Sequence, residues 1–269
     1  MKKYNYHTHT YRCGHAQKGI TDEDFVKEFI KCGFDAIAFT DHCPEKELID
    51  TRENMRMDYS QKDEYLASIN YLKEKYKNQI KIESGYEVEY LPGQEENLFE
   101  LKNEVDKIVL GQHFIYAEDN KNLKIFRHNL CDDFSDDDLI RYAQYLVKAM
   151  ELGIPDVIVH PDIYMLARDK FNEIESKIAH MICESAEKYN TMLEINLSDP
   201  RMYLLGRRDK ISYPCREFWE IVSNYNITVL YGIDTHYIGS ISSYEESVKF
   251  TNEVIGEDII KKLKFLKID

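Results

Sequence analysis

Histidines and carboxylates in this sequence gather in a few short motifs whose spacing suits metal binding. The chain opens with HTHT, in which one residue separates His7 from His9. In an extended strand such residues point to the same face, so the two imidazoles can bind one ion. Near the other end, GIDTH repeats this spacing with Asp234 and His236. Two surface histidines would explain a single pair, so the remaining motifs decide the interpretation.

Most other histidines follow segments with the composition of β-strands. Seven of the nine histidines fall at a predicted strand end or in the loop after the first strand: His7, His9, His15, His42, His113, His160 and His236. Histidines placed at random would fall on helices about as often, so this concentration indicates a common site. Imidazole is the commonest metal ligand in proteins, which makes a metal site the favoured interpretation.

Carboxylates occupy the same motifs: Glu87 and Glu89 in GYEVEY, Asp41 in TDH, Asp162 in HPD and Asp234 in GIDTH. A carboxylate can bridge two ions about 3.5–4 Å apart, a spacing that holds both the attacking and the leaving oxygen in phosphoryl displacement. The motifs therefore favour a multinuclear hydrolase. Glu87 and Glu89 point to one face, so either could supply the bridge.

Strands and helices that must position these residues alternate along the chain. The sequence predicts strands at Lys3–His7, Asp35–Thr40, Ile80–Glu89, Lys107–Gln112, Asp156–His160, Met192–Asn196 and Thr228–Ile233. It predicts helices at Asp22–Cys32, Gln61–Tyr76, Glu95–Val105, Asp136–Leu152, Asn172–Tyr189, Pro214–Tyr225 and Tyr244–Phe265. Such alternation is typical of an α/β fold with a parallel sheet. Thr21 and Ser135 precede acidic residues, as helix N-termini often do.

Two α/β architectures fit this pattern, an open doubly wound sheet and a TIM-like barrel. An open sheet that binds nucleotides usually carries a glycine-rich phosphate loop after its first strand, whereas HTHT ends the first strand here. Barrel enzymes gather their active-site residues at the C-terminal ends of the strands. The sequence therefore predicts a barrel with a metal site at that face. The two longest loops, Cys43–Tyr59 and Ile115–Asp133, are expected there too.

Composition indicates one globular domain over residues 1–269, because 43% of the residues are hydrophobic and no low-complexity linker divides them. Neither a signal peptide nor a membrane span is predicted, and six cysteines without a CxxC pair suit a reducing compartment. We therefore expect a cytoplasmic protein without a membrane partner. A net charge of −14 disfavours a nucleic acid polymer but is compatible with a small phosphate ester. The composition carries no signal of an oligomeric state.

The order of the motifs resembles that of the PHP (polymerase and histidinol phosphatase) family, in its histidinol-phosphatase branch. HTHTYRCGHA, FTDHCP and GYEVEY are similar to the first three motifs of that branch, and HPD and GIDTH to later ones. The resemblance runs from Tyr6 to Tyr237. It implies the PHP fold, a distorted (β/α)7 TIM-like barrel with a trinuclear centre of divalent metal ions. Sites with nitrogen and oxygen ligands accept Zn, Fe or Mn.

The resemblance also implies a ligand set for each ion. The first ion is expected at His7, His9, Glu87 and Asp234, the second at Glu87, His113 and His160, and the third at His15, His42 and His236. The expected catalytic residues are His7, His9, Glu87, Asp234 and His236. Glu87 is preferred to Glu89 because it fills the G-x-E position of the family. Asp41 and Asp162 are expected to orient His42 and His160, since ligating histidines usually donate their second N–H.

The family implies hydrolysis of a phosphate monoester. Bound ions lower the pKa of water from about 15.7 toward neutrality, so a hydroxide that bridges the metals is the expected nucleophile. The branch implies L-histidinol phosphate as the substrate, with L-histidinol and phosphate as products, in histidine biosynthesis. The alternative is another small phosphate ester, such as a nucleotide, a sugar phosphate or phosphotyrosine.

Substrate contacts are expected from Arg56, Arg127, His128 and Asn196. Arginine binds phosphate through two parallel hydrogen bonds, and Arg56 ranks first because its MRM motif resembles the histidinol-phosphatase branch. Asn196 and Glu194 end the sixth strand, where they could read the imidazole or amine of the substrate. Arg201, Arg207 and Arg208 are further candidates.

Two other classes of protein fit the sequence less well. An amidohydrolase-like barrel also opens with HxH, but it typically needs a lysine at a strand end near mid-chain, and no lysine here holds that position. A non-catalytic metal-binding module is expected to lack some ligands, and all nine are present.

Overall fold

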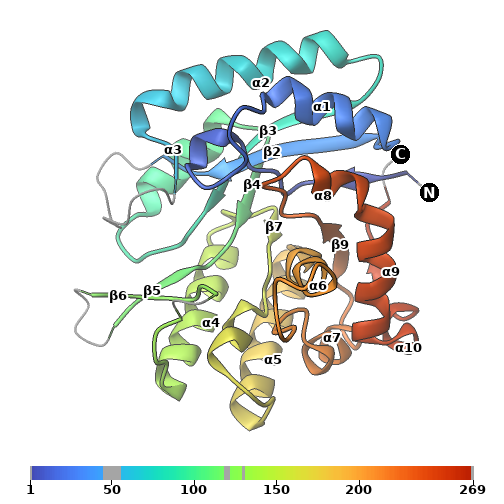
Figure 1. Cartoon of the computed structure of the whole chain (residues 1–269). Coiled ribbons are helices and arrows are strands. Elements are labelled where there is room, and N and C mark those ends of the chain that lie inside the picture. The colour runs from blue at the N-terminus through green and yellow to red at the C-terminus, as the bar shows by residue number, and fades with distance from the viewer. Residues whose placement is uncertain (1, 45–55, 118–121, 129–130, 268–269) are drawn as a thin grey trace.

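The strands form one curled parallel sheet in the computed structural model, which describes residues 2–44, 56–117, 122–128 and 131–267. The strand order is β1-β2-β3-β4-β7-β8-β9-β10 (Figure 1). The bounds are β1 Tyr4–Asn5, β2 Ala36–His42, β3 Lys81–Val88, β4 Lys107–Leu110, β7 Val157–Ile158, β8 Met192–Asn196, β9 Thr228–Gly232 and β10 Lys264–Phe265. The first seven are the predicted strands, in the predicted order, so the α/β prediction is confirmed.

Contacts between the two ends of the chain bring the edges of the sheet together. Thr8 forms an isolated parallel bridge with Thr235, and the backbone N–H of His9 donates to the Thr235 carbonyl at 3.0 Å. At the opposite end of the barrel, the hydroxyl of Tyr4 donates to the carbonyl of Leu266 at 3.1 Å, just after β10. Figure 1 shows the two termini close together at this seam. The distorted TIM-like barrel predicted from the sequence is therefore present.

Alternation along the strands divides the core into an inner and an outer part. On β2, Ala36 and Ala38 belong to a small inner cluster with residues of β1, β4, β7 and β9, whereas Ile37 and Phe39 belong to the outer cluster against the helices. Side chains two residues apart share a face of the strand, so His42 continues the inner row. Polar residues therefore line the end of the barrel where the strands have their C-termini, here called the upper end, and apolar residues pack its centre.

Helices lie along the outside of the sheet (Figure 1). Their bounds are α1 Asp22–Lys31, α2 Lys62–Tyr76, α3 Glu95–Glu104, α4 Asp136–Glu151, α5 Glu173–Tyr189, α6 Ser198–Leu204, α7 Arg216–Val222, α8 Gly239–Ser242, α9 Tyr244–Ile255 and α10 Glu257–Ile260. Thr21 and Ser135 cap α1 and α4 through reciprocal hydrogen bonds with Asp24 and Asp138, as the sequence predicts. None of the helices in the described ranges is long and apolar enough to span a membrane.

The last predicted helix, Tyr244–Phe265, begins at the predicted residue but is shorter than predicted. It ends at Gly256, whose φ of 107° lies outside the helical region, and the chain continues as α10 and the short strand β10. Isoleucines and leucines continue across this break at helical spacing, which explains the error. The predicted loop Ile115–Asp133 contains an antiparallel hairpin, β5 Phe114–Tyr116 with β6 Leu123–Ile125. Most of the other predicted loop, Cys43–Tyr59, lies outside the described residues.

Candidate metal centre

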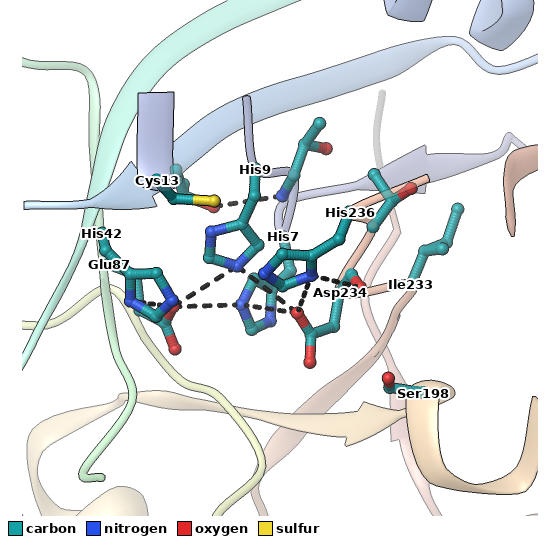
Figure 2. Close-up of polar contacts among 12 residues, drawn as sticks. His7, His9, Cys13, His42, Glu87, Ser198, Ile233, Asp234 and His236 are labelled. Atoms are coloured by element: carbon teal, nitrogen blue, oxygen red, sulfur yellow. Dashed lines mark hydrogen bonds and ion pairs between the residues drawn. The ribbon is translucent and has the colours of Figure 1, made fainter. Parts of the chain in front are cut away.

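Nine histidine and carboxylate side chains lie at the C-terminal ends of the strands, at the upper end of the barrel. His42 and Glu87 lie on β2 and β3, whereas the others follow β1, β4, β7 and β9: His7, His9, His15, His113, His160, Asp234 and His236. All except His7 line a cavity of about 350 Å³, and His7 is buried beside it. Figure 2 shows six of the nine, with their polar atoms pointing toward one another.

Glu87 lies at the centre of the group, and each of its oxygens faces a different set of imidazoles. Oε2 is 3.1, 3.4 and 3.5 Å from nitrogen atoms of His42, His9 and His7. Oε1 is 3.1 and 3.7 Å from the Nε2 atoms of His160 and His113. One carboxylate on β3 therefore faces residues that lie on or just after β1, β2, β4 and β7. A bridging ligand requires such a position.

Asp234 faces the same histidines from the end of β9. Its Oδ1 is 3.3 Å from His9 Nε2, 3.6 Å from His7 Nε2 and 3.4 Å from His236 Nδ1. The backbone of Asp234 is left-handed, with φ of 50°, which ends the strand and turns the following residues across the barrel mouth. This turn places the His236 ring parallel to the His9 ring, with centroids 4.0 Å apart.

His15 joins the group from the loop after β1. Its Nδ1–H donates to the carbonyl of Cys13 at 3.0 Å, since a carbonyl only accepts, so its Nε2 carries the lone pair. The His15 ring centroid lies 4.5 Å from that of His236 and 5.5 Å from that of His42. The three rings therefore form one side of the cavity.

Unpaired polar atoms show that these residues fit metal ions. His7 Nε2, His9 Nε2, Glu87 Oε2, His160 Nδ1 and His236 Nε2 are buried and have no hydrogen-bond partner among the described residues. Leaving such a group unpaired costs about 1–3 kcal/mol, and here several lie together. Ligand atoms of His7, His9 and Glu87 lie within 4.8 Å of one another, as do those of His9, His42 and His236. Imidazole and carboxylate donors at this spacing suit divalent ions.

The charges within the cluster are strongly coupled. Burial alone lowers the pKa of His7, but the carboxylates of Glu194, Asp234 and Glu87 raise it well above its ordinary value. Burial disfavours the charged form of Glu87, yet the neighbouring histidines hold its pKa well below the usual range. Burial lowers the pKa of His236, so the cluster mixes charged and neutral imidazoles. Ions that bind here must displace protons from the charged ones.

Glu89 lies at the edge of the cluster, unlike Glu87. Its Oε1 accepts from His113 Nδ1 at 2.9 Å, and its Oε2 lies 3.4 Å from Arg56 Nη1. His113 Nε2 is thereby left facing Glu87. This arrangement supports Glu87 as the bridging residue and Glu89 as the residue that orients His113.

The predicted orienting roles of Asp41 and Asp162 are wrong. Asp41 Oδ1 is 3.5 Å from Nδ1 of His9, not beside the ring of His42, because adjacent residues in a strand point to opposite faces. Asp162 accepts from the backbone N–H of Cys215 at 2.6 Å and has no contact with the His160 ring among the described residues. His160 has a left-handed backbone, with φ of 34°, so the chain turns away before Asp162.

The predicted substrate contacts fall in different places. Arg127 and His128 line the cavity, together with Arg208. Arg56 does not line it and instead contacts Glu89 and the carbonyl of Cys43. Asn196 also lies off the cavity lining, and its Nδ2 donates to Asp234 Oδ2 at 3.4 Å.

Asp199 and Tyr213, beside Arg127 and His128, were not predicted from the sequence, whereas Glu194 was predicted as a possible substrate contact. Asp199 is buried, and its Oδ1 lies 3.0 Å from His128 Nε2 and 3.6 Å from Arg208 Nε. Tyr213 lines the cavity between the rings of His128 and His160. Glu194 is fully buried behind His7. Neither Asp199 nor Tyr213 left a signal in the sequence, whereas Glu194 stood out as a charged residue inside the apolar strand MLEIN.

Comparisons with known proteins place the chain among proteins of known family. The PHP domain matches residues 5–198. A probable histidinol-phosphatase from Deinococcus radiodurans is 22% identical over 94% of both chains. The histidinol-phosphatase of Bacillus subtilis is 27% identical over 125 residues, which are 44% of this chain and 46% of that protein.

A solved structure shares the fold. Histidinol phosphate phosphatase from Lactococcus lactis, complexed with zinc, L-histidinol and phosphate, is 17% identical with a TM-score of 0.66. The match covers 93% of this chain and 94% of that one. At this identity the likeness concerns the fold. Because the PHP match includes most of the chain and the motifs from HTHT to HPD, this chain belongs to the PHP domain family.

Proposed function

We propose that this chain, a metal-dependent phosphatase of the PHP family, hydrolyses L-histidinol phosphate to L-histidinol and phosphate in histidine biosynthesis. The observation that carries the reaction type is the convergence of five histidines on the carboxylate of Glu87: His7, His9, His42, His113 and His160. The names of the relatives, and the histidinol and phosphate in the Lactococcus complex, support the substrate.

Three divalent ions, of Zn, Fe or Mn, are proposed for this site. The ligand sets are His7, His9, Glu87 and Asp234 for the first, Glu87, His113 and His160 for the second, and His15, His42 and His236 for the third. The proposal is supported by Glu87 Oε2 at 3.5 Å from His7 Nε2, by Glu87 Oε1 at 3.1 Å from His160 Nε2, and by ligand atoms of His9, His42 and His236 within 4.8 Å of one another. Bound there, the ions would supply a hydroxide nucleophile at neutral pH and neutralise charge on the phosphate. The chain's own role is to hold the ligands rigidly and to orient the ester.

The wall opposite the cluster is suited to orienting a phosphate ester. Arg127 and Arg208 offer cationic donors to the anionic group, and buried Asp199 holds His128 and Arg208 in place. Ile125, Phe126, Ile163 and Leu166 add an apolar surface that suits one face of a planar ring. The cavity volume of about 350 Å³ falls within the range of small-molecule sites.

The decisive experiment compares substrates on the metal-loaded protein. We expect phosphate release from L-histidinol phosphate to exceed release from nucleoside monophosphates and p-nitrophenyl phosphate in kcat/KM. Glu87→Gln should lose bound metal and at least ~10³-fold of activity, because the ions supply both nucleophile and charge stabilisation. The exposed Glu74→Gln is the matched control and should change neither. Comparable low rates on every ester would exclude the histidinol assignment.

The second candidate is hydrolysis of a different small phosphate ester by the same centre. Its support is the pair of arginines in the cavity lining, Arg127 and Arg208, which is unusual in a chain of net charge −14 and suits a substrate with a second anionic group. A preference for such an ester in the same assay would favour this candidate and leave the metal centre unaffected.

A further inference from the structure

Glu194 is a fully buried carboxylate beside the metal centre that the proposed chemistry does not use. It lies on β8, and neither of its oxygens reaches the cavity lining, so it cannot contact a substrate there. The apolar neighbours Leu193 and Ile195 face the outer core, whereas Glu194 points into the barrel. A buried charge in this position requires partners that compensate its loss of hydration.

Its hydrogen-bond partners are Asn196, whose Nδ2 donates to Oε2 at 3.3 Å, and two proposed metal ligands from different strands. Glu194 Oε1 lies 2.9 Å from Nδ1 of His7, which follows β1. Glu194 Oε2 accepts from the backbone N–H of His160, which follows β7, at 2.9 Å. The Glu194 carboxylate therefore connects a residue that follows β1 with a residue that follows β7, although β8 and β9 lie between these strands.

Gly232 makes this connection possible. It lies on the neighbouring strand β9, and a Cβ atom at this position would come within 1.4 Å of Glu194 Oε1. Any side chain at Gly232 would occupy the path that the carboxylate follows to His7. Glycine is therefore required at this position of GIDTH because it leaves space for the carboxylate. A turn is not the reason, since the φ of Gly232 is not in the left-handed region.

The contact with Glu194 decides which nitrogen of His7 is available. Nδ1 of His7 is occupied by the contact with Glu194 Oε1, so Nε2 is the nitrogen that faces Glu87 Oε2, at 3.5 Å. His160 is held in an unfavourable left-handed backbone, and its N–H bond to Glu194 helps to stabilise that conformation. The same conformation directs His160 Nε2 to Glu87 Oε1, at 3.1 Å.

We infer that Glu194 is a positioning residue that orients His7 and His160 for metal binding, and that Gly232 provides the space it needs. This role rests on the proposed metal-dependent function. It replaces the expectation that Glu194 reads the imidazole or amine of the substrate. Carboxylates that orient ligating histidines typically contribute 10–100-fold to metal affinity or activity.

Zinc affinity, measured by competition with a chromophoric chelator, tests this role without reference to any substrate. We expect Glu194→Gln to bind zinc about 10–100-fold more weakly than the wild type. Glu83→Gln is the matched control, because Glu83 is a buried carboxylate on β3 that pairs with Lys81 and should leave zinc affinity unchanged. Equal affinity of Glu194→Gln and wild type would refute the positioning role.

Gly232→Ala provides a second test that a general loss of stability would not mimic. With Glu194 present, the added methyl should displace the carboxylate and weaken zinc binding as Glu194→Ala does. In the double variant, the two losses should not add, because the methyl then has nothing to displace. Losses that add would overturn the inference. A wild-type protein that binds none of zinc, iron and manganese would instead refute the metal-dependent function itself, which keeps the two failures distinct.

Discussion

At the scale of single residues, the protonation of the cluster determines how ions enter it. Burial opposes charge on His7 and His9, but nearby carboxylates outweigh it and raise both pKa values, that of His9 to about 9. Both imidazoles are therefore protonated at pH 7 in the metal-free protein. His42 and His236 have pKa values lowered by burial and are already neutral.

Metal binding at pH 7 is accordingly expected to release protons from His7 and His9, because a ligand nitrogen must be deprotonated. Titration calorimetry with zinc in buffers of different ionisation enthalpy measures this release, which should fall as the pH approaches 9. A heat that is independent of the buffer would contradict the prediction. In the metal-free protein, the raised pKa of His9 stabilises the fold below about pH 6.5, and this contribution is lost as the pH rises through about 9.

The arginines give a second prediction at this scale. Arg127 lines the cavity and Arg56 does not, so Arg127→Gln should lower kcat/KM about 10–100-fold, mainly through KM, as expected for a lost hydrogen bond to a charged group. Arg56→Gln should act through Glu89 and His113 and weaken metal binding with little change in KM. Steady-state kinetics and metal analysis of both variants separate the two roles. A raised KM for Arg56→Gln together with weakened metal binding for Arg127→Gln would instead identify Arg56 as the substrate contact.

At the scale of elements, close approach between strands decides whether Glu87 can reach its place. Gly111, just after β4, faces the inside of the barrel, and a Cβ atom there would lie 2.0 Å from Glu87 Oε1. The short GQHF segment thus leaves space for the bridging carboxylate of the neighbouring strand. His113 then lies two residues further on the same face.

Gly111→Ala is therefore expected to displace Glu87 and to abolish metal binding while the barrel still folds. Gly239→Ala is the matched control, because no atom lies within 4 Å of a Cβ placed there. Metal content and far-UV circular dichroism of both variants are the measurements. A Gly111→Ala protein with full metal content would show that Glu87 tolerates the displacement.

At the scale of the whole molecule, the seam between the first and last strands joins residues from the two ends of the chain. Thr8 pairs with Thr235, and Tyr4 bonds to Leu266. The sheet cannot keep its edges together if either end unfolds alone. We therefore propose that residues 1–269 form a single cooperative domain.

Unfolding in urea tests this proposal, since Trp219 is the single tryptophan and is fully buried in α7. Its fluorescence and the far-UV circular dichroism should change in one coincident transition. Two separate midpoints would show that the chain contains two units.

Several features were determined by the sequence alone, because they depend on local periodicity and on residue type. The seven strand positions, the caps at Thr21 and Ser135 and the grouping of histidines at strand ends could be predicted from it. The order of motifs from HTHT to GIDTH identified the family that the later comparison confirmed. None of these requires knowledge of which distant segments meet.

Only the tertiary structure decided which polar atoms face one another. Asp41 turned out to contact His9, Arg56 to contact Glu89, and Glu194 to connect His7 with His160. Such pairings depend on the curl of the sheet and on left-handed residues such as His160, which reverse the alternation that a sequence pattern assumes. The physical reason is that a sequence gives the face of each strand, whereas distances across a barrel follow from how the strands close on one another.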